Sequence, residues 1–325
     1  MKKEKISAII ITYNSAEDIL NCIESIYKED SNTEVIVVDN NSLDNTIEQI
    51  SDNFPEVKII SIPDNYGYAT GVNRGIAESS GELLLIINPD SQVLPGALDT
   101  MCQTLALPEV GAVGPVLIDQ KGVIDPNSHR YQISWQVILF IILGMVSKKL
   151  DIAPLRRYYY LKPTREGPDQ VGILSGSCMM VKREVIQWVG GMDASFFLFG
   201  EDIDFSLRIR QRGFRLYYQP RARVIHYAGH SRRSNLPQVI AEEIWSMARL
   251  AAKLDWGITS RIVFGLGILL LPLRFIRLRP KRVRQPGAEA LKVGEMLKYL
   301  YLKIRTLGFP WRNLHQKENV FLKRG

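Results

Sequence analysis

Short apolar runs alternate with segments of helical periodicity over the first part of the chain, and no other feature constrains the fold as strongly. Strands are expected at residues 6–12, 34–38, 57–62 and 83–87, with helices starting at residues 16, 43 and 70 between them. Strands that are almost wholly apolar and are separated by helices are typical of a parallel sheet covered on both faces. The pattern therefore predicts an α/β fold.

Polar residues follow three of these strands, where ligands bind in open α/β sheets. The groups are Thr12-Tyr13-Asn14, Asp39-Asn40-Asn41 and Asn88-Pro89-Asp90. At such an edge Asp39 could accept hydrogen bonds from a base or a ribose, but it could equally cap a turn. Asp90 is an oxygen ligand of the kind that a hard divalent cation prefers.

The later part of the chain is expected to contain a strand at 172–182, a helix at 201–213 and two short strands within 214–226. Residues 119–169 look like an irregular insertion with an apolar stretch. Glu201 and Asp202 stand at the predicted helix start, where the helix dipole favours ionised carboxylates. Without further information, such a group is also typical of a solvated helix cap.

Charge and cysteine content narrow the class of protein. The formal net charge is +7, and the densest basic run, 274–284, directly follows an uncharged stretch at 262–273. That stretch is too short to span a bilayer, so we expect an interfacial helix on an anionic membrane surface. No zinc-finger spacing or RNA-binding motif is present, and no nucleic-acid partner is expected. Three widely spaced cysteines predict neither a disulfide framework nor a structural zinc site.

Several motifs in a fixed order resemble the family 2 glycosyltransferases, and among these the rhamnosyltransferase-like members. They are Ile9 to Asn14, Val37 to Ser42, Asn65 to Gly75, Leu85 to Asp90, Phe199 to Asp204, and His226 with His230. The resemblance implies a GT-A fold, a Rossmann-like α/β domain with a mostly parallel sheet, over residues 1–235. Residues 236–325, which carry none of these motifs, are expected to form a helical, basic, membrane-associated region.

The resemblance implies a binding site for a nucleotide-sugar donor. Asp39 is expected to contact the pyrimidine ring, Arg74 to face the diphosphate, and Asn88 to bind sugar or ribose. Glycines such as Gly67 would let the backbone approach the ligand, and His230 would lie in a loop that closes over the donor. The full set of expected donor-binding residues is Thr12, Tyr13, Asn14, Asp39, Asn65, Gly67, Asn73, Arg74, Asn88 and His230.

The resemblance also implies a cation and a catalytic base. Asn88-Pro89-Asp90 stands in place of the family's D-x-D motif, so Asp90 is the expected ligand of Mg²⁺ or Mn²⁺, and His226 would complete the metal site. The second acid of the Glu201-Asp202 pair would take the proton of the acceptor hydroxyl. Glu201 would orient substrate or base, and Asp204 is an alternative candidate for the base.

The expected reaction is a metal-dependent, inverting transfer of one sugar to an acceptor hydroxyl at the cytoplasmic face of a membrane. The donor most like that of the subfamily is dTDP-rhamnose, with UDP-hexose and UDP-galactofuranose as alternatives. The apolar and basic segments suggest a lipid-linked saccharide acceptor, as in the assembly of a cell-surface polysaccharide. A nucleotidyltransferase-like enzyme and a non-catalytic, membrane-attached nucleotide-binding protein are the interpretations from other classes.

Overall fold

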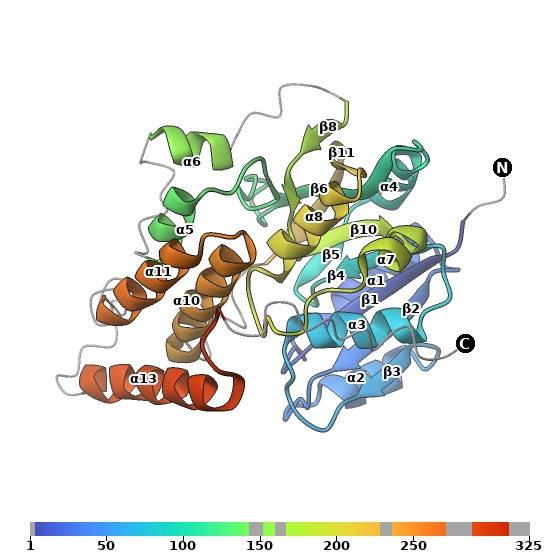
Figure 1. The fold of residues 1–325 in the computed structure, drawn as a ribbon. Coiled ribbons are helices and arrows are strands. Elements are labelled where there is room, and N and C mark those ends of the chain that lie inside the picture. Colours follow the sequence, from blue (N-terminus) through green and yellow to red (C-terminus); the bar gives the residue numbers. More distant parts are fainter. Residues whose placement is uncertain (1–3, 143–151, 160–166, 228–235, 271–287, 312–325) are drawn as a thin grey trace.

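The computed structural model describes residues 4–142, 152–159, 167–227, 236–270 and 288–311, and Figure 1 shows their arrangement. A twisted central sheet carries helices on both faces. Beside it lies a separate layer of helices that come from the middle and the end of the chain. The functional residues are positioned by the sheet and by the loops that connect it to this helical layer.

The sheet is mixed, although most of its strands are parallel. Its first four strands are all parallel and lie in the order β3 (Lys58–Ser61), β2 (Glu34–Asp39), β1 (Ile6–Thr12) and β4 (Leu83–Ile87). The order continues with β10 (Cys178–Lys182), β6 (Val110–Ile118), β11 (Arg215–His226) and β5 (Ser91–Val93), while β8 (Asp169–Val171) also pairs with β11. Because β10 is antiparallel to both β4 and β6, and β11 is parallel to β6, the strands β1, β2, β4, β6 and β11 all end at one edge.

Residues along β1 point alternately to the two faces of the sheet, as the period of a strand requires. Ala8 and Ile10 belong to the face that is covered by α1 (Ile19–Glu29), α2 (Thr46–Asn53) and α4 (Ala97–Leu105). Ile9 and Ile11 face α3 (Tyr68–Glu78), α7 (Arg183–Val189) and α8 (Glu201–Gln211). On that side Gly75 brings α3 against the strand, since a Cβ there would lie 2.3 Å from Ile9 Cγ2.

The helical layer has a hydrophobic core of its own. The layer consists of α5 (Trp135–Ile142), α6 (Ala153–Tyr158), α10 (Leu236–Lys253), α11 (Gly257–Leu269) and α13 (Ala288–Leu307). Trp245 is fully buried in this core, and Phe196 and Ile203 from around the start of α8 also belong to it. The helical layer is therefore packed against the segment that carries the Glu201-Asp202 pair. In a small sheet of β7 (His129–Arg130) and β9 (Ile173–Leu174), Ile173 belongs to the core of the helical layer and Leu174 to the core beneath α3, α7 and α8.

Several predicted boundaries differ from those in the structure, and three of these differences have identifiable reasons. The first helix begins at Ile19 and not at residue 16, because the N–H groups of Asp18 and Ile19 bond to the Ser15 carbonyl and form a turn first. The segment 172–182 is divided into β9 and β10 by a loop at 175–177. Conversely, 214–226 contains one strand, whose register shifts near Pro220, a residue that cannot donate to the ladder.

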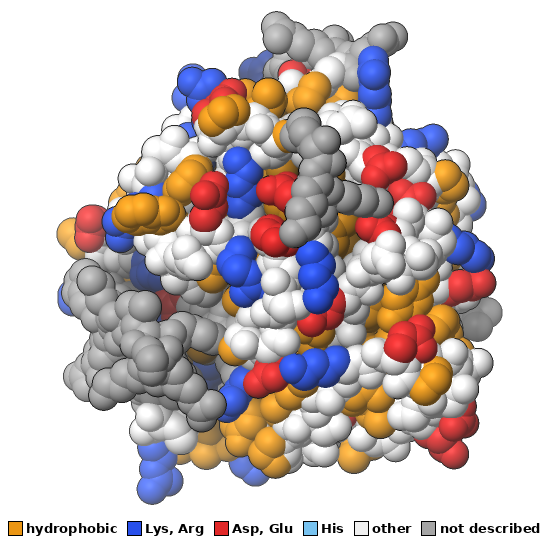
Figure 2. Space-filling view, turned by 90° about the vertical axis from the view of Figure 1, so that its right-hand side faces the viewer, with side chains coloured by type: hydrophobic (Ala, Val, Ile, Leu, Met, Phe, Trp, Pro, Cys, Tyr) orange, Lys and Arg blue, Asp and Glu red, His pale blue; other side chains and the backbone are white. Residues whose placement is uncertain are grey.

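The surface of the sheet domain carries both signs of charge. Figure 2 shows basic and acidic side chains interspersed over the face that it presents, with areas of hydrophobic side chains between them. Within the described residues, none of the helices is both long enough and apolar enough to cross a bilayer. The basic run at 274–284 and the end of the uncharged stretch before it lie outside the described residues.

Candidate active site

The ends of β1 and β2 form a polar cluster at the common edge of the sheet. Asp39 is buried, and its carboxylate accepts hydrogen bonds from the backbone N–H and the hydroxyl of Ser42. Asn14 has a φ of 53° and binds the same turn, since its N–H donates to Ser42 Oγ and its Oδ1 accepts from the N–H of Leu43. The two strand ends are thus fixed to each other, and Tyr13 beside them is 43% exposed.

Asp90 and His226 meet at the same edge, shortly beyond β4 and at the end of β11. The pairing of His226 with Ser91 brings β11 to the segment after Asp90, and Asp90 Oδ1 lies 3.4 Å from His226 Nε2. Asp125 Oδ2 lies 3.8 Å from the other ring nitrogen. Burial lowers the pKa of His226, but Asp125 and Asp90 outweigh this effect and raise it to about 9. The surroundings of the imidazole therefore favour positive charge.

Glu201 and Asp202 are both buried at the start of α8, in different surroundings. Asp202 Oδ2 lies 3.1 Å from Arg130 Nη1 and accepts a hydrogen bond from the N–H of Gly176, at 3.2 Å. Glu201 Oε2 has no hydrogen-bond partner among the described residues. Burial and the neighbouring charge of Asp202 raise the pKa of Glu201 well above the usual carboxyl range. Asp202 is thus the acid of this pair that has a cationic partner.

The loop at 175–177 connects this acid pair to the strand ends. Its Ser177 carbonyl accepts the N–H of Asn88, at 2.9 Å, and its Gly176 carbonyl accepts the hydroxyl of Tyr68, at 2.6 Å. Burial raises the pKa of Tyr68, and the charges of Glu201, Asp202 and Asp90 raise it further. The acid pair, the loop and the end of β4 are therefore joined through direct contacts.

Asp204, the alternative candidate for the base, is held by two cations. Its carboxylate oxygens lie 2.7 Å from Arg208 Nε and 2.5 Å from Lys253 Nζ, and the residue is 4% exposed. Arg208 also donates to the carbonyls of Val189 and Gly191. A carboxylate enclosed in this way is poorly placed to accept a proton from a substrate. The surroundings of Asp204 therefore indicate a structural role.

Some predicted donor-binding residues are engaged elsewhere in the fold. The amide of Asn73 donates to the carbonyl of Met192 and accepts its N–H, so both of its polar groups are used to connect α3 to the loop before α8. Gly67 has a φ of 88°, and its close neighbour is the backbone of Phe197 and not an open ligand site. Asn65 makes a turn with the N–H of Gly67, Arg74 is exposed on α3, and His230 lies outside the described residues.

Several buried polar atoms along the common edge have no hydrogen-bond partner in the described structure. They are Thr12 Oγ1, Asn40 Oδ1, Ser91 Oγ, Glu201 Oε2 and His226 Nδ1. Native proteins satisfy nearly all such groups with protein, water or ligand. Their concentration at the strand ends and at the acid pair indicates a place where a polar ligand or ordered water completes the hydrogen bonding.

Asp90 and His226 fit a cation that the substrate helps to hold. A carboxylate and a neutral imidazole suit Mn²⁺, and a bound cation would displace the proton of His226. Mg²⁺ is usually bound by one or two carboxylates together with substrate phosphates. Across the parts of the chain that the structure describes, no three His, Cys, Asp or Glu side chains form a group that could hold a metal by themselves. The geometry is thus that of an open site and not of a closed protein cage.

Tyr68, Asp125 and Arg130 belong to this site although sequence reasoning gave them no role. Tyr68 lies inside the Asn65–Gly75 motif, so its position was available as a signal. Asp125 and Arg130 come from the segment interpreted as an irregular insertion, and no pattern in that segment marks them. Only the fold shows that one faces His226 and the other Asp202.

The mixed sheet, with polar residues at its carboxyl edge and a separate acid pair beyond it, has the architecture of the GT-A fold. The chain superposes with a TM-score of 0.59 on the crystal structure of GalNAc-T7 with UDP, GalNAc and Mn²⁺, covering 95% of this chain and 59% of that one at 15% identity. At that identity the likeness establishes the fold.

The chain belongs to glycosyl transferase family 2, whose family model matches residues 7–190. The N-acetylglucosaminyl-diphospho-decaprenol L-rhamnosyltransferase of Mycobacterium tuberculosis is 32% identical over 209 residues, or 61% of this chain and 67% of the relative. The dTDP-rhamnosyl transferase RfbF of Shigella flexneri is 26% identical over 227 residues, or 69% of each chain. The predicted family and its rhamnosyltransferase-like character are thereby confirmed.

Proposed function

We propose that this protein transfers rhamnose from dTDP-rhamnose to a hydroxyl of a polyprenyl-diphosphate-linked saccharide, with inversion at the anomeric carbon. The donor and the acceptor class are supported by the functions of the two rhamnosyltransferases described above. The observation that carries the proposal is the convergence of two pairs: Asp90 with His226, and Asp202 with Arg130. The short segment from Asp125 to Arg130 reaches both.

In this proposal the two pairs have different roles. Asp90 and His226 would hold Mg²⁺ or Mn²⁺, and the bound cation would supply positive charge to the departing dTDP. Asp202 takes the proton from the acceptor hydroxyl as its oxygen forms the new bond to the anomeric carbon and the bond from that carbon to the diphosphate breaks. Arg130 and the N–H of Gly176 orient the Asp202 carboxylate. Asp39 binds the pyrimidine at the ends of β1 and β2.

We further propose that the enzyme works at the cytoplasmic face of a membrane, where it meets its lipid-linked acceptor. The basic run at 274–284 supplies charge for an anionic lipid surface, and an uncharged stretch precedes it. Each Lys or Arg near such a surface contributes about 1 kcal/mol, an attraction that salt weakens. Binding of the protein to anionic vesicles, and its release by salt, tests this part of the proposal.

The experiment that tests the function is an assay of the purified full chain with Mn²⁺ or Mg²⁺. The acceptor is polyprenyl-diphosphate-linked N-acetylglucosamine, and the donors are dTDP-rhamnose, UDP-glucose and UDP-galactofuranose. We expect transfer from dTDP-rhamnose alone. Transfer only from a UDP donor would overturn the rhamnose assignment, and binding of none of the donors would overturn the proposed enzyme activity.

The base assignment is tested by Asp202→Asn. Loss of the proton acceptor should lower kcat by about 10²- to 10⁴-fold while dTDP-rhamnose still binds, as measured by calorimetry. Asp52→Asn, which removes one exposed charge from α2, is the matched control and should leave kcat unchanged. Full activity of the Asp202→Asn enzyme would show that another group accepts the proton.

A further inference from the structure

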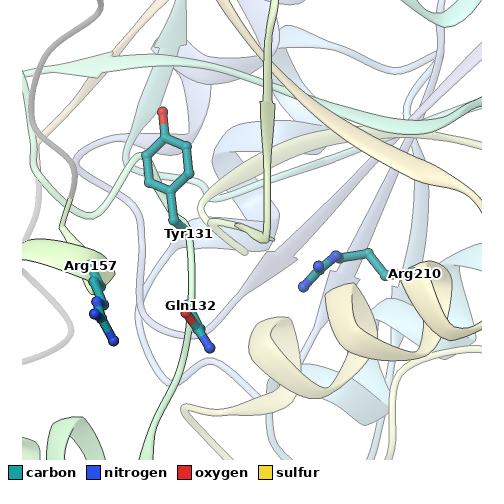
Figure 3. A pocket seen from close by; sticks show the side chains of 4 residues that line it. All are labelled: Tyr131, Gln132, Arg157 and Arg210. Carbon is teal, nitrogen blue, oxygen red and sulfur yellow. The ribbon is translucent and has the colours of Figure 1, made fainter. Parts of the chain in front are cut away.

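A hollow of about 740 Å³ is lined by Tyr131, Gln132, Arg157 and Arg210, and Tyr131 directly follows Arg130, the partner of Asp202. Figure 3 shows that these side chains come from three elements: the segment after β7, the helix α6, and the later half of α8. The guanidinium of Arg210 points toward Gln132, and Arg157 lies on the other side of Gln132. The N–H of Tyr131 donates to the carbonyl of Tyr158, at 3.2 Å, which fixes the segment to α6.

The lining of this hollow is cationic and includes no carboxylate among the described residues. That differs from the face in Figure 2, where charges of both signs are interspersed. Within the part of the chain that the structure describes, neither Arg157 nor Arg210 forms an ion pair or a side-chain hydrogen bond. Two guanidinium groups at one hollow, together with the amide of Gln132, make a set of donors suited to the oxygens of a phosphate or diphosphate.

The hollow lies on the far side of the proposed base from the cation site. Along the segment that leads to it, Asp125 faces His226, Arg130 contacts Asp202, and Tyr131 then lines the hollow. On α8, Arg210 follows Asp202 by eight residues, or about 12 Å along the helix axis at 1.5 Å per residue. A single sugar with a diphosphate on its anomeric carbon could reach from the base into this hollow.

The surface that follows the hollow is apolar. Helix α5 begins three residues after Gln132, has no charged residue, and presents Trp135 with 48% of its surface exposed. A ligand with a diphosphate in the hollow and a hydrocarbon chain beyond it would find apolar contacts there. A free phosphate would gain no binding energy from that apolar surface. The hollow and α5 together therefore favour a ligand with both a diphosphate and a hydrocarbon chain.

We propose that Arg157 and Arg210 bind the diphosphate of the lipid-linked acceptor and thereby hold its sugar against Asp202. This inference rests on the proposed function, because it specifies how the acceptor of that reaction is recognised. The hollow is distinct from the donor's own diphosphate site at Asp90 and His226. Its occupant is the acceptor's diphosphate and not a membrane phospholipid headgroup.

The variants Arg157→Gln and Arg210→Gln test the proposal. Each should raise the KM for polyprenyl-diphosphate-linked N-acetylglucosamine by about 10-fold or more, the usual size of a lost hydrogen bond to a charged group. The KM for dTDP-rhamnose should not change. Arg212→Gln removes the same charge from an exposed position beside α8 that does not line the hollow, and should leave both constants unchanged.

Direct binding makes the test independent of catalysis. Farnesyl diphosphate should bind the wild-type protein, compete with the acceptor, and bind both variants about 10-fold more weakly. The affinity for farnesol, which has no diphosphate, should be the same in the variants as in the wild type. Equal affinity of the variants and wild type for farnesyl diphosphate would overturn the inference, as would a raised KM for the donor in place of the acceptor. Variants that lose only their binding to anionic vesicles would assign the hollow to phospholipid headgroups. Failure of the wild-type enzyme to transfer any sugar would instead count against the proposed function.

Discussion

A buried ion pair attaches α13, the last described helix, to α10. Lys303 of α13 places its ammonium group 2.5 Å from both carboxylate oxygens of Glu242 on α10. Glu242 has no exposed surface, Lys303 is 8% exposed, and the hydroxyl of Tyr299 also donates to this carboxylate. Lys303→Met removes the cation and leaves the buried carboxylate with the Tyr299 hydroxyl.

The expected cost follows from that burial. Removing one partner of a buried pair typically destabilises a protein by about 3–5 kcal/mol, because the remaining charge is left without compensation. Tyr299 offsets part of this, so we expect about 3 kcal/mol, at the lower end. Adding Glu242→Gln to the Lys303→Met protein removes the uncompensated negative charge. The double variant should therefore recover most of the lost free energy of unfolding.

Urea unfolding followed by circular dichroism measures the free energies of the two single variants and the double variant. The coupling energy of this cycle should be at least about 2 kcal/mol, within the range for residues in direct contact. Hydrogen exchange over residues 288–307 shows whether α13 opens first. A cost below about 1 kcal/mol for Lys303→Met, with unchanged exchange in α13, would refute the reasoning.

Three further predictions concern the site and its support. Burial and the charge of Asp202 raise the pKa of Glu201 in the folded protein. The protonated carboxyl therefore contributes stability at low pH, and this stability is lost as the pH rises through the folded-state pKa. In thermal unfolding scans, Glu201→Gln should make the decline of stability with pH less steep. Gly75→Ala should cost about 1–3 kcal/mol of stability in urea unfolding, since the new Cβ would lie against Ile9. EDTA should abolish transfer and Mn²⁺ restore it, with Asp90→Asn requiring about 10-fold or more Mn²⁺ for half-maximal rate in a metal titration.

The first half of the sheet could be predicted because its local signals agree with its tertiary setting. Residues 6–12 and 83–87 are uninterrupted, mostly apolar runs, and the structure has β1 and β4 with those same bounds. Each strand is buried on both faces by helices, which is the circumstance in which an apolar run specifies a strand most clearly. For the same reason the sequence could place Asp90 just beyond the end of β4, while its role as a metal ligand stays a prediction.

The contacts of the acid pair could not be predicted, because they depend on segments that are far apart in the chain. Arg130 lies 72 positions before Asp202, in a two-residue strand that carries no periodicity. The ion pair of Asp204 with Lys253 could not be predicted either. Lys253 comes from a helix whose apolar pattern indicates only that one helix face is buried. Asn73 resembled a ligand-binding residue by its motif, and only the fold shows its amide bound to Met192.

The helical layer changes how membrane attachment has to be tested. Its helices hold the loop that leads into Asp202: Ser246 donates to the carbonyl of Leu198, and Lys253 lies 2.7 Å from Asp193. Removing residues 236–325 would therefore release this loop and expose the core around Phe196, so a loss of transfer would not distinguish a missing membrane anchor from a loosened active site. Replacing the basic residues of 274–284 with Gln avoids this, because it removes the charge of that run and keeps the helices of the described residues in the chain. If that variant binds anionic vesicles as tightly as the wild type, the basic run is not the attachment site.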